Sequence, residues 1–148
     1  MASPTTNQEE YAQFFVDLIT NNLAAVGLAD VFYGDQQKIA KTPIACVEPG
    51  MKRREENGAP RRYMNLMNTH IIIYHGQVQS TSQNQKVTDG IAESLQDLIH
   101  ADATLEGRCI DSVVRSVEPG YQTRGTSLFR ASMLTVEARQ QELLPSNF

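Results

Sequence analysis

Three histidines and two cysteines are the side chains of this 148-residue chain best suited to metal binding or nucleophilic chemistry. His70 and His75 lie five residues apart in an apolar, strand-like stretch, so their side chains would point to opposite faces and could not easily share an ion. Cys46 and Cys109 lie in similar stretches, where a free thiol usually packs as a small hydrophobic side chain. The sequence contains no metal-binding or nucleophile motif. We therefore expect no catalytic site, no metal and no cofactor.

The charged stretch 51–62 contains five of the thirteen Lys and Arg residues of the chain. Its candidate contact residues are Lys52, Arg53, Arg54, Glu55, Glu56, Arg61 and Arg62. Phosphate attraction is one reading, but the chain has a net charge of −4, and only Tyr63 offers a ring for base stacking. The alternating signs suit a solvated hairpin tip, or reciprocal ion pairs with a neighbouring copy, equally well. The charge pattern leaves these three alternatives open.

The sequence Val-Glu-Pro-Gly occurs twice, at Val47–Gly50 and Val117–Gly120. Proline followed by glycine predicts a type II turn, because glycine tolerates the positive φ that this turn requires. We therefore expect two β-hairpins, the first carrying 51–62 as a projecting basic loop. The second hairpin supplies further candidate contact residues, namely Glu118, Tyr121, Arg124 and Arg130. The similarity ends with the turn, so it does not indicate an internal duplication.

Hydrophobic periodicity predicts two amphipathic helices, one over 7–26 and one from the polar stretch 80–84 to about His100. The first follows a capping box in Thr6–Glu9 and ends at Gly27. The strand-like segments are 30–33, 43–48, 61–78, 108–118 and 126–139. The order α-β-β-β-α-β-β predicts an α+β fold, in which a mostly antiparallel sheet with two long hairpins packs against the two helices.

The length of 148 residues is usual for one domain, here 1–148, with 1–6 and 141–148 expected to be flexible. The longest apolar run, Ile71–Tyr74, is far shorter than the roughly 20 residues that cross a bilayer. The first ten residues lack the basic and apolar regions of a signal peptide. We therefore expect no membrane partner and synthesis in the cytoplasm.

Several stretches of this chain resemble one known family. They are Pro43–Gly50 (PIACVEPG), the long strand running into Tyr74–Ser80 (YHGQVQS), Asp89–Gly107 (DGIAESLQDLIHADATLEG) and Val113–Tyr121 (VVRSVEPGY). The family is the tail terminator, or tail completion, proteins of tailed bacteriophages, and the resemblance covers most of the chain. These small α/β proteins cap a finished tail tube and present it to the head.

The resemblance implies a ring of identical subunits, usually six, at the head-proximal end of the virion tail and assembled in the host cytoplasm. Its partners would be the tail tube protein and the head-tail connector protein. The loop 51–62 would face a neighbouring subunit, or else the lumen through which the tape measure protein and DNA pass as cargo. The family has no active site to transfer to this chain. A head-tail connector or head-closure protein is the nearest alternative, and a small nucleic-acid-binding domain using Lys52–Arg62 is an alternative from another class.

Overall fold

The computed structural model describes residues 6–36, 38–39, 41–56, 62–77 and 81–143. The elements, in chain order, are α1 (Gln8–Thr20), α2 (Leu23–Val26), β1 (Asp30–Tyr33), β2 (Ile44–Glu56), β3 (Arg62–Gln77), α3 (Thr81–His100), β4 (Asp111–Arg124) and β5 (Ser127–Leu143). The strands form one sheet of order β1-β2-β3-β5-β4. β1 runs parallel to β2, and all other neighbours pair antiparallel. The predicted α+β class is confirmed, with a mixed sheet and three helices.

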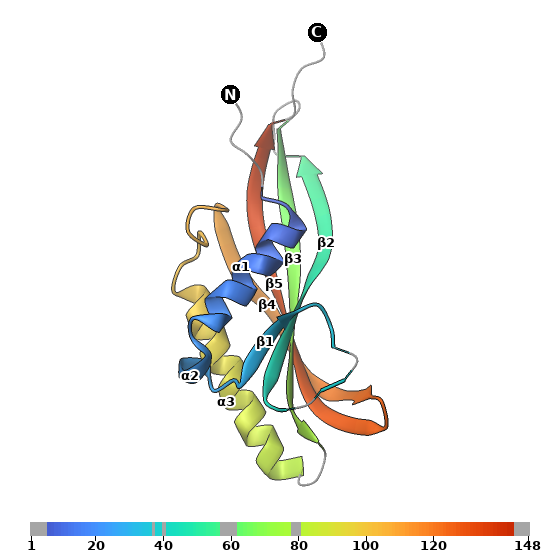
Figure 1. Cartoon of the computed structure of the whole chain (residues 1–148). Coiled ribbons are helices and arrows are strands. Elements are labelled where there is room, and N and C mark those ends of the chain that lie inside the picture. The colour runs from blue at the N-terminus through green and yellow to red at the C-terminus, as the bar shows by residue number, and fades with distance from the viewer. Residues whose placement is uncertain (1–5, 37, 40, 57–61, 78–80, 144–148) are drawn as a thin grey trace.

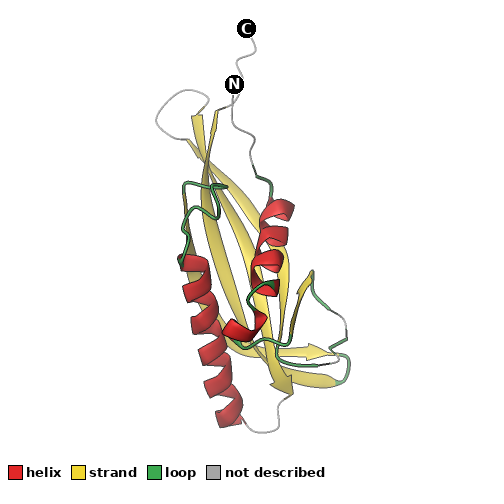
Figure 2. Ribbon diagram, turned by 60° about the vertical axis from the view of Figure 1, so that its left-hand side comes forward, coloured by secondary structure: helices red, strands yellow, loops and turns green. Residues whose placement is uncertain are grey.

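The helices α1 and α3 lie side by side on one face of the sheet (Figures 1 and 2). At one end, β2, β3 and β5 continue beyond α1, and at the other end the β4–β5 hairpin turns away from α3 (Figure 1). The sheet is therefore longer than the helical layer that covers it. In the described part of the chain, no helix combines the length and the apolarity needed to span a membrane.

The first helix has the predicted capping box, but one residue later than expected. Asn7, not Thr6, is the N-cap: its side chain accepts the backbone N–H of Glu10 at 2.8 Å. The carboxylate of Glu10 accepts the backbone N–H of Asn7 in return, at 3.3 Å. Both donors would otherwise lack a partner at the start of the helix.

The helix expected over 7–26 is interrupted, because α1 ends at Thr20 and α2 begins at Leu23. The side chain of Asn22 donates to the Leu18 carbonyl at 2.8 Å, a local bond that competes with regular helical geometry. Gly27 ends α2 with φ at 84°, the left-handed C-cap that the sequence predicts.

One apolar core joins the helices to the sheet. Its largest fully buried side chains are Tyr11, Phe15, Ile19, Met67, Ile71, Ile73, Leu95, Ile99, Leu105 and Leu134. The one hydroxyl among them is satisfied, since Tyr11 donates to Gln140 Oε1 at 2.8 Å and lies 3.0 Å from the Arg108 carbonyl. The bond to Gln140 attaches the start of α1 to β5, close to the end of that strand.

A second, smaller cluster lies on the opposite face of the sheet. It consists of Ile44, Cys46, Tyr74, Phe129 and Ala131, with Phe32, Ile39 and Ile72 packed at its border. The rings of Tyr74 and Phe129 meet edge to face, with centroids 6.1 Å apart. This cluster buries the root of the β4–β5 hairpin, whereas the rest of this face has no described helix over it.

The prediction that Val-Glu-Pro-Gly forms two hairpin turns is wrong. Val47–Gly50 lies within β2 and Val117–Gly120 within β4. Pro49 pairs with Thr69, and the register shifts before Lys52, so the first copy forms an irregularity in a continuous strand. Pairing with β3 keeps Pro49 extended, and pairing with β5 keeps Pro119 extended, which overrides the local preference of the Pro-Gly dipeptide for a turn.

The strands are also longer than the periodicity predicts. The strand expected over 108–118 begins at Asp111 and runs to Arg124, and Gly125, at φ 64°, makes the turn into β5. β5 continues to Leu143, so residues 141–143, expected to be flexible, are paired with β3. Residues 144–148 lie outside the described residues. At the other end of the chain, Thr6 bonds through its backbone to the side chain of Gln140 at 3.1 and 3.2 Å.

The segment after α3 folds around one carboxylate. Asp102 accepts the backbone N–H of Glu106 at 2.8 Å and the hydroxyl of Thr104 at 2.9 Å. These bonds lower the pKa of Asp102. They hold three successive left-handed residues, with φ of 51° at Leu105, 59° at Glu106 and 83° at Gly107. The turn places Leu105 in the core, where it is 1% exposed, and this explains the Asp-x-Thr-Leu-x-Gly spacing.

The two glycines of the repeated sequence provide a matched test of this packing. A Cβ on Gly50 would lie 2.8 Å from the Asn68 carbonyl oxygen and 2.9 Å from His70 Nε2, whereas a Cβ on Gly120 would meet nothing within 4 Å. Gly50→Ala should therefore lower the free energy of unfolding by about 1–3 kcal/mol through overpacking. Gly120→Ala should change it by less than about 0.5 kcal/mol. Equal urea-unfolding midpoints for the two variants would contradict the close approach at Gly50.

Candidate functional site

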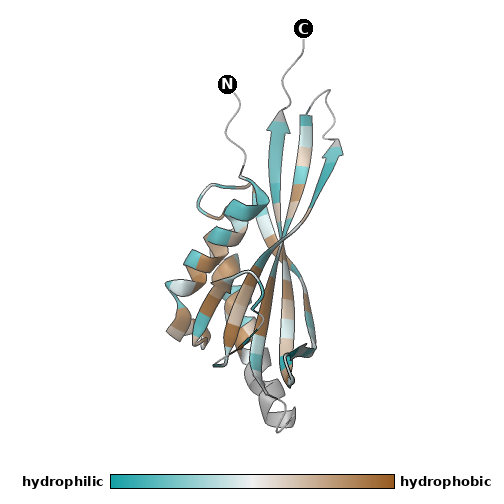
Figure 3. Cartoon of the chain, turned by 45° about the vertical axis from the view of Figure 1, so that its right-hand side comes forward, coloured by the Kyte–Doolittle hydropathy of each residue, from teal (hydrophilic) through white to brown (hydrophobic). Residues whose placement is uncertain are grey.

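The part of the sheet that extends beyond α1 contains the basic residues singled out in the sequence. We call it the distal ribbon: Met51–Glu56 of β2, Arg62–Leu66 of β3 and Arg139–Leu143 of β5, which lie in register side by side. The upper ends of these strands are mainly hydrophilic, in contrast to the apolar middle of the sheet (Figure 3). The stretch predicted as a loop over 51–62 therefore belongs, as far as it is described, to the end of β2 and the start of β3, and residues 57–61 lie outside the described residues.

Arg54 of β2 binds side chains on the two other strands of the distal ribbon. Its guanidinium lies 3.2 Å from Glu142 Oε2 and donates to Asn65 Oδ1 at 3.4 Å. The buried amide of Asn65 donates to the same Glu142 oxygen at 2.6 Å. This hydrogen bond, together with the charges of Arg54 and Lys52, lowers the pKa of Glu142. One polar network thus connects β2, β3 and β5 where no helix covers them.

The other candidate residues of the ribbon are exposed. Arg53 forms an ion pair with Glu55 at 3.1 Å on the same strand, and both side chains are more than half exposed. Lys52 and Arg62 have no ion pair within the described part of the chain. Arg61 and the side chain of Glu56, both predicted contacts, lie outside the described residues. The ribbon therefore presents Lys52, Arg53 and Arg62 to solvent.

At the other end of the sheet, Arg124 is held within the molecule. It forms an ion pair with Asp35, and its guanidinium lies 5.3 Å from the ring centroid of Tyr74. The Tyr74 hydroxyl donates to the second carboxylate oxygen of Asp35 at 2.8 Å. These contacts attach the tip of the β4–β5 hairpin to the segment that follows β1. Arg124, predicted as a contact residue, has a side chain only 19% exposed.

Arg130 is buried as well, at 7% exposed. It donates to the Tyr121 hydroxyl at 2.8 Å, and its charge lies 5.2 Å from the ring centroid of that residue. Its Nε atom and Nδ1 of His75 are buried and find no hydrogen-bond partner among the described residues. Burial, followed by the charge of Arg130, lowers the pKa of His75. The guanidinium of Arg130 is therefore engaged within the chain, and its role as a contact residue stays a prediction.

Glu118 and Tyr121 are the exposed candidates of the second hairpin. They lie at a hollow of about 160 Å³ on the uncovered face, together with Ile72, Ala131 and Met133. Tyr121 is 48% exposed, although its hydroxyl is bonded to Arg130. Glu118 has no ion pair within the described residues. The hollow is half apolar and has one free carboxylate, a composition typical of a protein contact.

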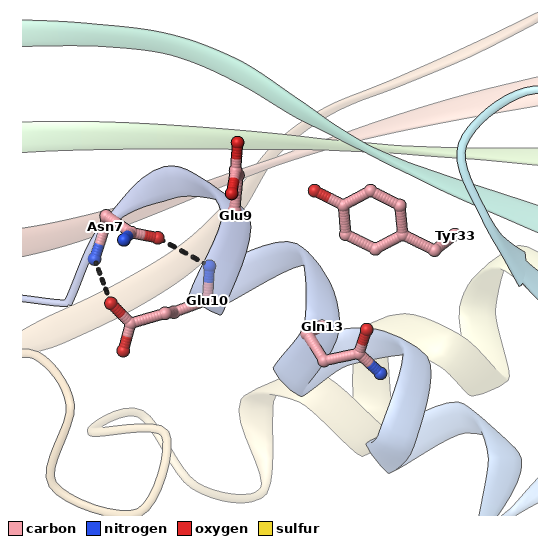
Figure 4. A pocket seen from close by; sticks show the side chains of 5 residues that line it. All are labelled: Asn7, Glu9, Glu10, Gln13 and Tyr33. Atoms are coloured by element: carbon pink, nitrogen blue, oxygen red, sulfur yellow. Dashed lines mark hydrogen bonds between the residues drawn. The ribbon is translucent and has the colours of Figure 1, made fainter.

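A second depression lies between α1 and the end of β1. The side chains of Glu9 and Tyr33 face the same open space, with Gln13 beside them, while Asn7 and Glu10 are engaged in the capping box (Figure 4). The depression is wide open and lacks a basic side chain among its lining residues. Its lining side chains do not converge on one point, and the charged groups among them are the carboxylates of Glu9 and Glu10.

The thiols and imidazoles do not form a reactive cluster. Burial raises the pKa of both Cys46 and Cys109 to about 11, so both thiols stay protonated at neutral pH. His70 bonds to Thr135, with 3.2 Å between Nδ1 and Oγ1, and His75 lies at a register shift of β3. Within the described ranges, no group of His, Cys, Asp or Glu side chains could hold a metal ion.

Sequence reasoning missed the acidic partners Asp35 and Glu142 and the buried amide Asn65. Asp35 and Glu142 lie 89 and 88 residues from their arginines, so spacing contains no trace of these pairings. Asn65, near the start of β3 and between Met64 and Leu66, was an available signal, because buried polar groups need partners.

Comparisons with known proteins give no further assignment. No protein-family model matches this chain, and no curated protein matches it either. The resemblance to tail terminator proteins is therefore a proposal.

The network at Glu142 makes a pH-dependent prediction. Because the pKa of Glu142 is lowered in the folded chain, its stabilisation is fully present above its unfolded pKa of about 4.3 and is lost as the pH falls through the folded value. Glu142→Gln should lower the free energy of unfolding at pH 7 by about 1 kcal/mol and reduce the loss of stability below pH 5. Urea unfolding at several pH values measures both. Glu118→Gln, at an exposed carboxylate without an ion pair, is the matched control, and identical pH profiles for the two variants would refute the network.

Proposed function

We propose that this chain is a structural virion protein of a tailed phage, a tail terminator that closes the end of the tail tube as a ring. The observation that carries the proposal is that one sheet has open edges on both sides. β1 pairs with β2 only at Ile44–Val47, so Glu48–Glu56 has no described strand on its outer side. β4 is the opposite edge, and its outer side is free of described strands from Asp111 to Arg124.

Two different edges on one molecule suit a head-to-tail contact. A closed ring requires two unlike patches that meet around a rotation axis, and the edges of β2 and β4 are unlike in length, side chains and charge. β2 and β4 run in opposite directions in this sheet, so a rotated neighbour would bring them together as an antiparallel pair. The activity of such a protein is geometric: it stops tube growth and offers its second side to the head.

The distribution of charge favours a protein contact over nucleic-acid binding. Arg53 and Arg54 are paired with Glu55 and Glu142, so the distal ribbon has fewer free cations than its sequence suggests. A binder of phosphates presents unpaired Lys and Arg side chains on one surface. The partners we propose are a second copy of this chain, the tail tube protein and the head-tail connector protein. Within the same class, a head-tail connector or head-closure protein is the alternative.

Assembly state is the direct test. Multi-angle light scattering should detect a single closed oligomer, either of the purified chain at high concentration or of the chain mixed with tail tubes. A monomer under both conditions would overturn the proposal.

Deletion of the gene from its phage separates the two neck roles under electron microscopy. Overlong or unjoined tails are expected for a terminator. Complete tails beside leaking heads would instead indicate head closure.

A further inference from the structure

The repeated Val-Glu-Pro-Gly sequence lies on the two strands of the sheet that have open edges. A proline lacks the N–H that would pair with an incoming strand, so it is tolerated in a strand where its nitrogen faces away from the existing neighbour. Natural sheets use edge prolines in this way to prevent uncontrolled strand addition. Pro49 of β2 pairs with Thr69, and Pro119 of β4 pairs with Ser132, so both prolines lie within edge strands.

The outward direction at Pro49 follows from its neighbour Val47. The Val47 carbonyl accepts the N–H of Gly34 at 2.7 Å on the outer side of β2, where β1 ends. Residues two apart on a strand direct their backbone groups to the same side, so Pro49 would direct its N–H to this edge if it had one. In the irregularity that follows, the Gly50 carbonyl accepts the side chain of Gln8 of α1 at 2.9 Å. The outer edge of β2 therefore lacks a donor at Pro49, and from Met51 onward no described strand pairs with it.

The strand registers show in which rows of the sheet the outer edges of β2 and β4 are both free of described strands. Arg53 pairs with Leu66, Leu66 with Arg139, and Arg139 with Asp111, so these four residues form one row across the sheet. The next row runs from Lys52 to Ser112. Further down, the row from Cys46 ends at Glu118, but there β1 already occupies the edge of β2. Copies related by rotation about an axis along the strands keep each row at one height.

We propose that copies of this chain join through a short strand pair, Met51–Arg53 of one copy beside Asp111–Val113 of the next. Pro49 stops this pairing from extending toward β1, and Pro119 keeps other strands from adding to the edge of β4. The inference rests on the proposed ring for the identity of the partner. Charge supports the register, because the junction brings the cations Lys52 and Arg53 to Asp111, which has no ion pair within the described residues. Opposite charges on facing strands favour such a pair.

Cross-linking tests the register. In the variant Arg53→Cys with Asp111→Cys, mild oxidation of the assembled protein should give a ladder of covalent oligomers that ends at the ring number. Each single variant can give no species larger than a dimer, because one new thiol cannot link a chain on both sides. Arg53→Cys with Gln122→Cys, which places the second thiol beyond Pro119, should give no ladder. The native thiols are buried and contribute little.

The outcomes separate the two proposals. Closed oligomers in light scattering without a ladder from the Arg53 and Asp111 variant would overturn the strand pair and leave the terminator function standing. A ladder from the Gln122 variant of equal yield would also overturn it. The complete absence of oligomers, with and without tail tubes, would overturn both.

Restoring the backbone N–H that Pro119 lacks tests the role of this proline. Pro119→Thr adds an outward N–H to β4, and should convert closed oligomers into larger, polydisperse assemblies at the same concentration. Gln122→Thr adds the same side chain to the same strand without a new outward donor, and should assemble like the parent chain. Circular dichroism confirms that both variants are folded. Unchanged assembly of Pro119→Thr, or equal enlargement with Gln122→Thr, would refute the role of the proline.

Discussion

The two central strands are longer than the helices of this chain can cover. A strand rises about 3.3 Å per residue and a helix about 1.5 Å. The 17 residues of β5 therefore span about 56 Å, whereas the 13 residues of α1 span about 20 Å and the 20 residues of α3 about 30 Å. Two helices on one face can bury only the middle of such a sheet. The exposed ends and the polar networks that hold them follow from this mismatch of length.

Where helix cover ends, polar contacts between strands replace apolar burial. Asn65 and Glu142 join three strands through Arg54 in the distal ribbon, and Asp35 holds Arg124 at the hairpin. Each network places a carboxylate between groups that donate to it, which stabilises a partly exposed region that apolar packing cannot reach. The same contacts engage Arg54 and Arg124, two of the cations that looked available for binding. Of the candidate cations in the described residues of the distal ribbon, Lys52 of β2 and Arg62 of β3 have no ion pair.

The helices and the core could be derived from the sequence, because periodicity reports burial directly. The apolar face of α1, the left-handed cap at Gly27 and the burial of both cysteines follow from local rules. The Val-Glu-Pro-Gly segments could not be derived in this way. A Pro-Gly pair in isolation favours a turn, and only the presence of β3 beside β2 and β5 beside β4 keeps it extended. The burial of Arg130 could not be derived either, because it depends on the pairing of β4 with β5, which brings Tyr121 to its guanidinium.

The contact between Arg124 and Asp35 has a mechanical consequence. Arg124 belongs to the strand at one margin of the sheet, and Asp35 follows the strand at the other margin, with Tyr74 between them. The two margins are thus tethered across the uncovered face, independently of the hydrogen bonds that run through the sheet. A displacement of the hairpin tip would therefore be transmitted directly to the segment that follows β1.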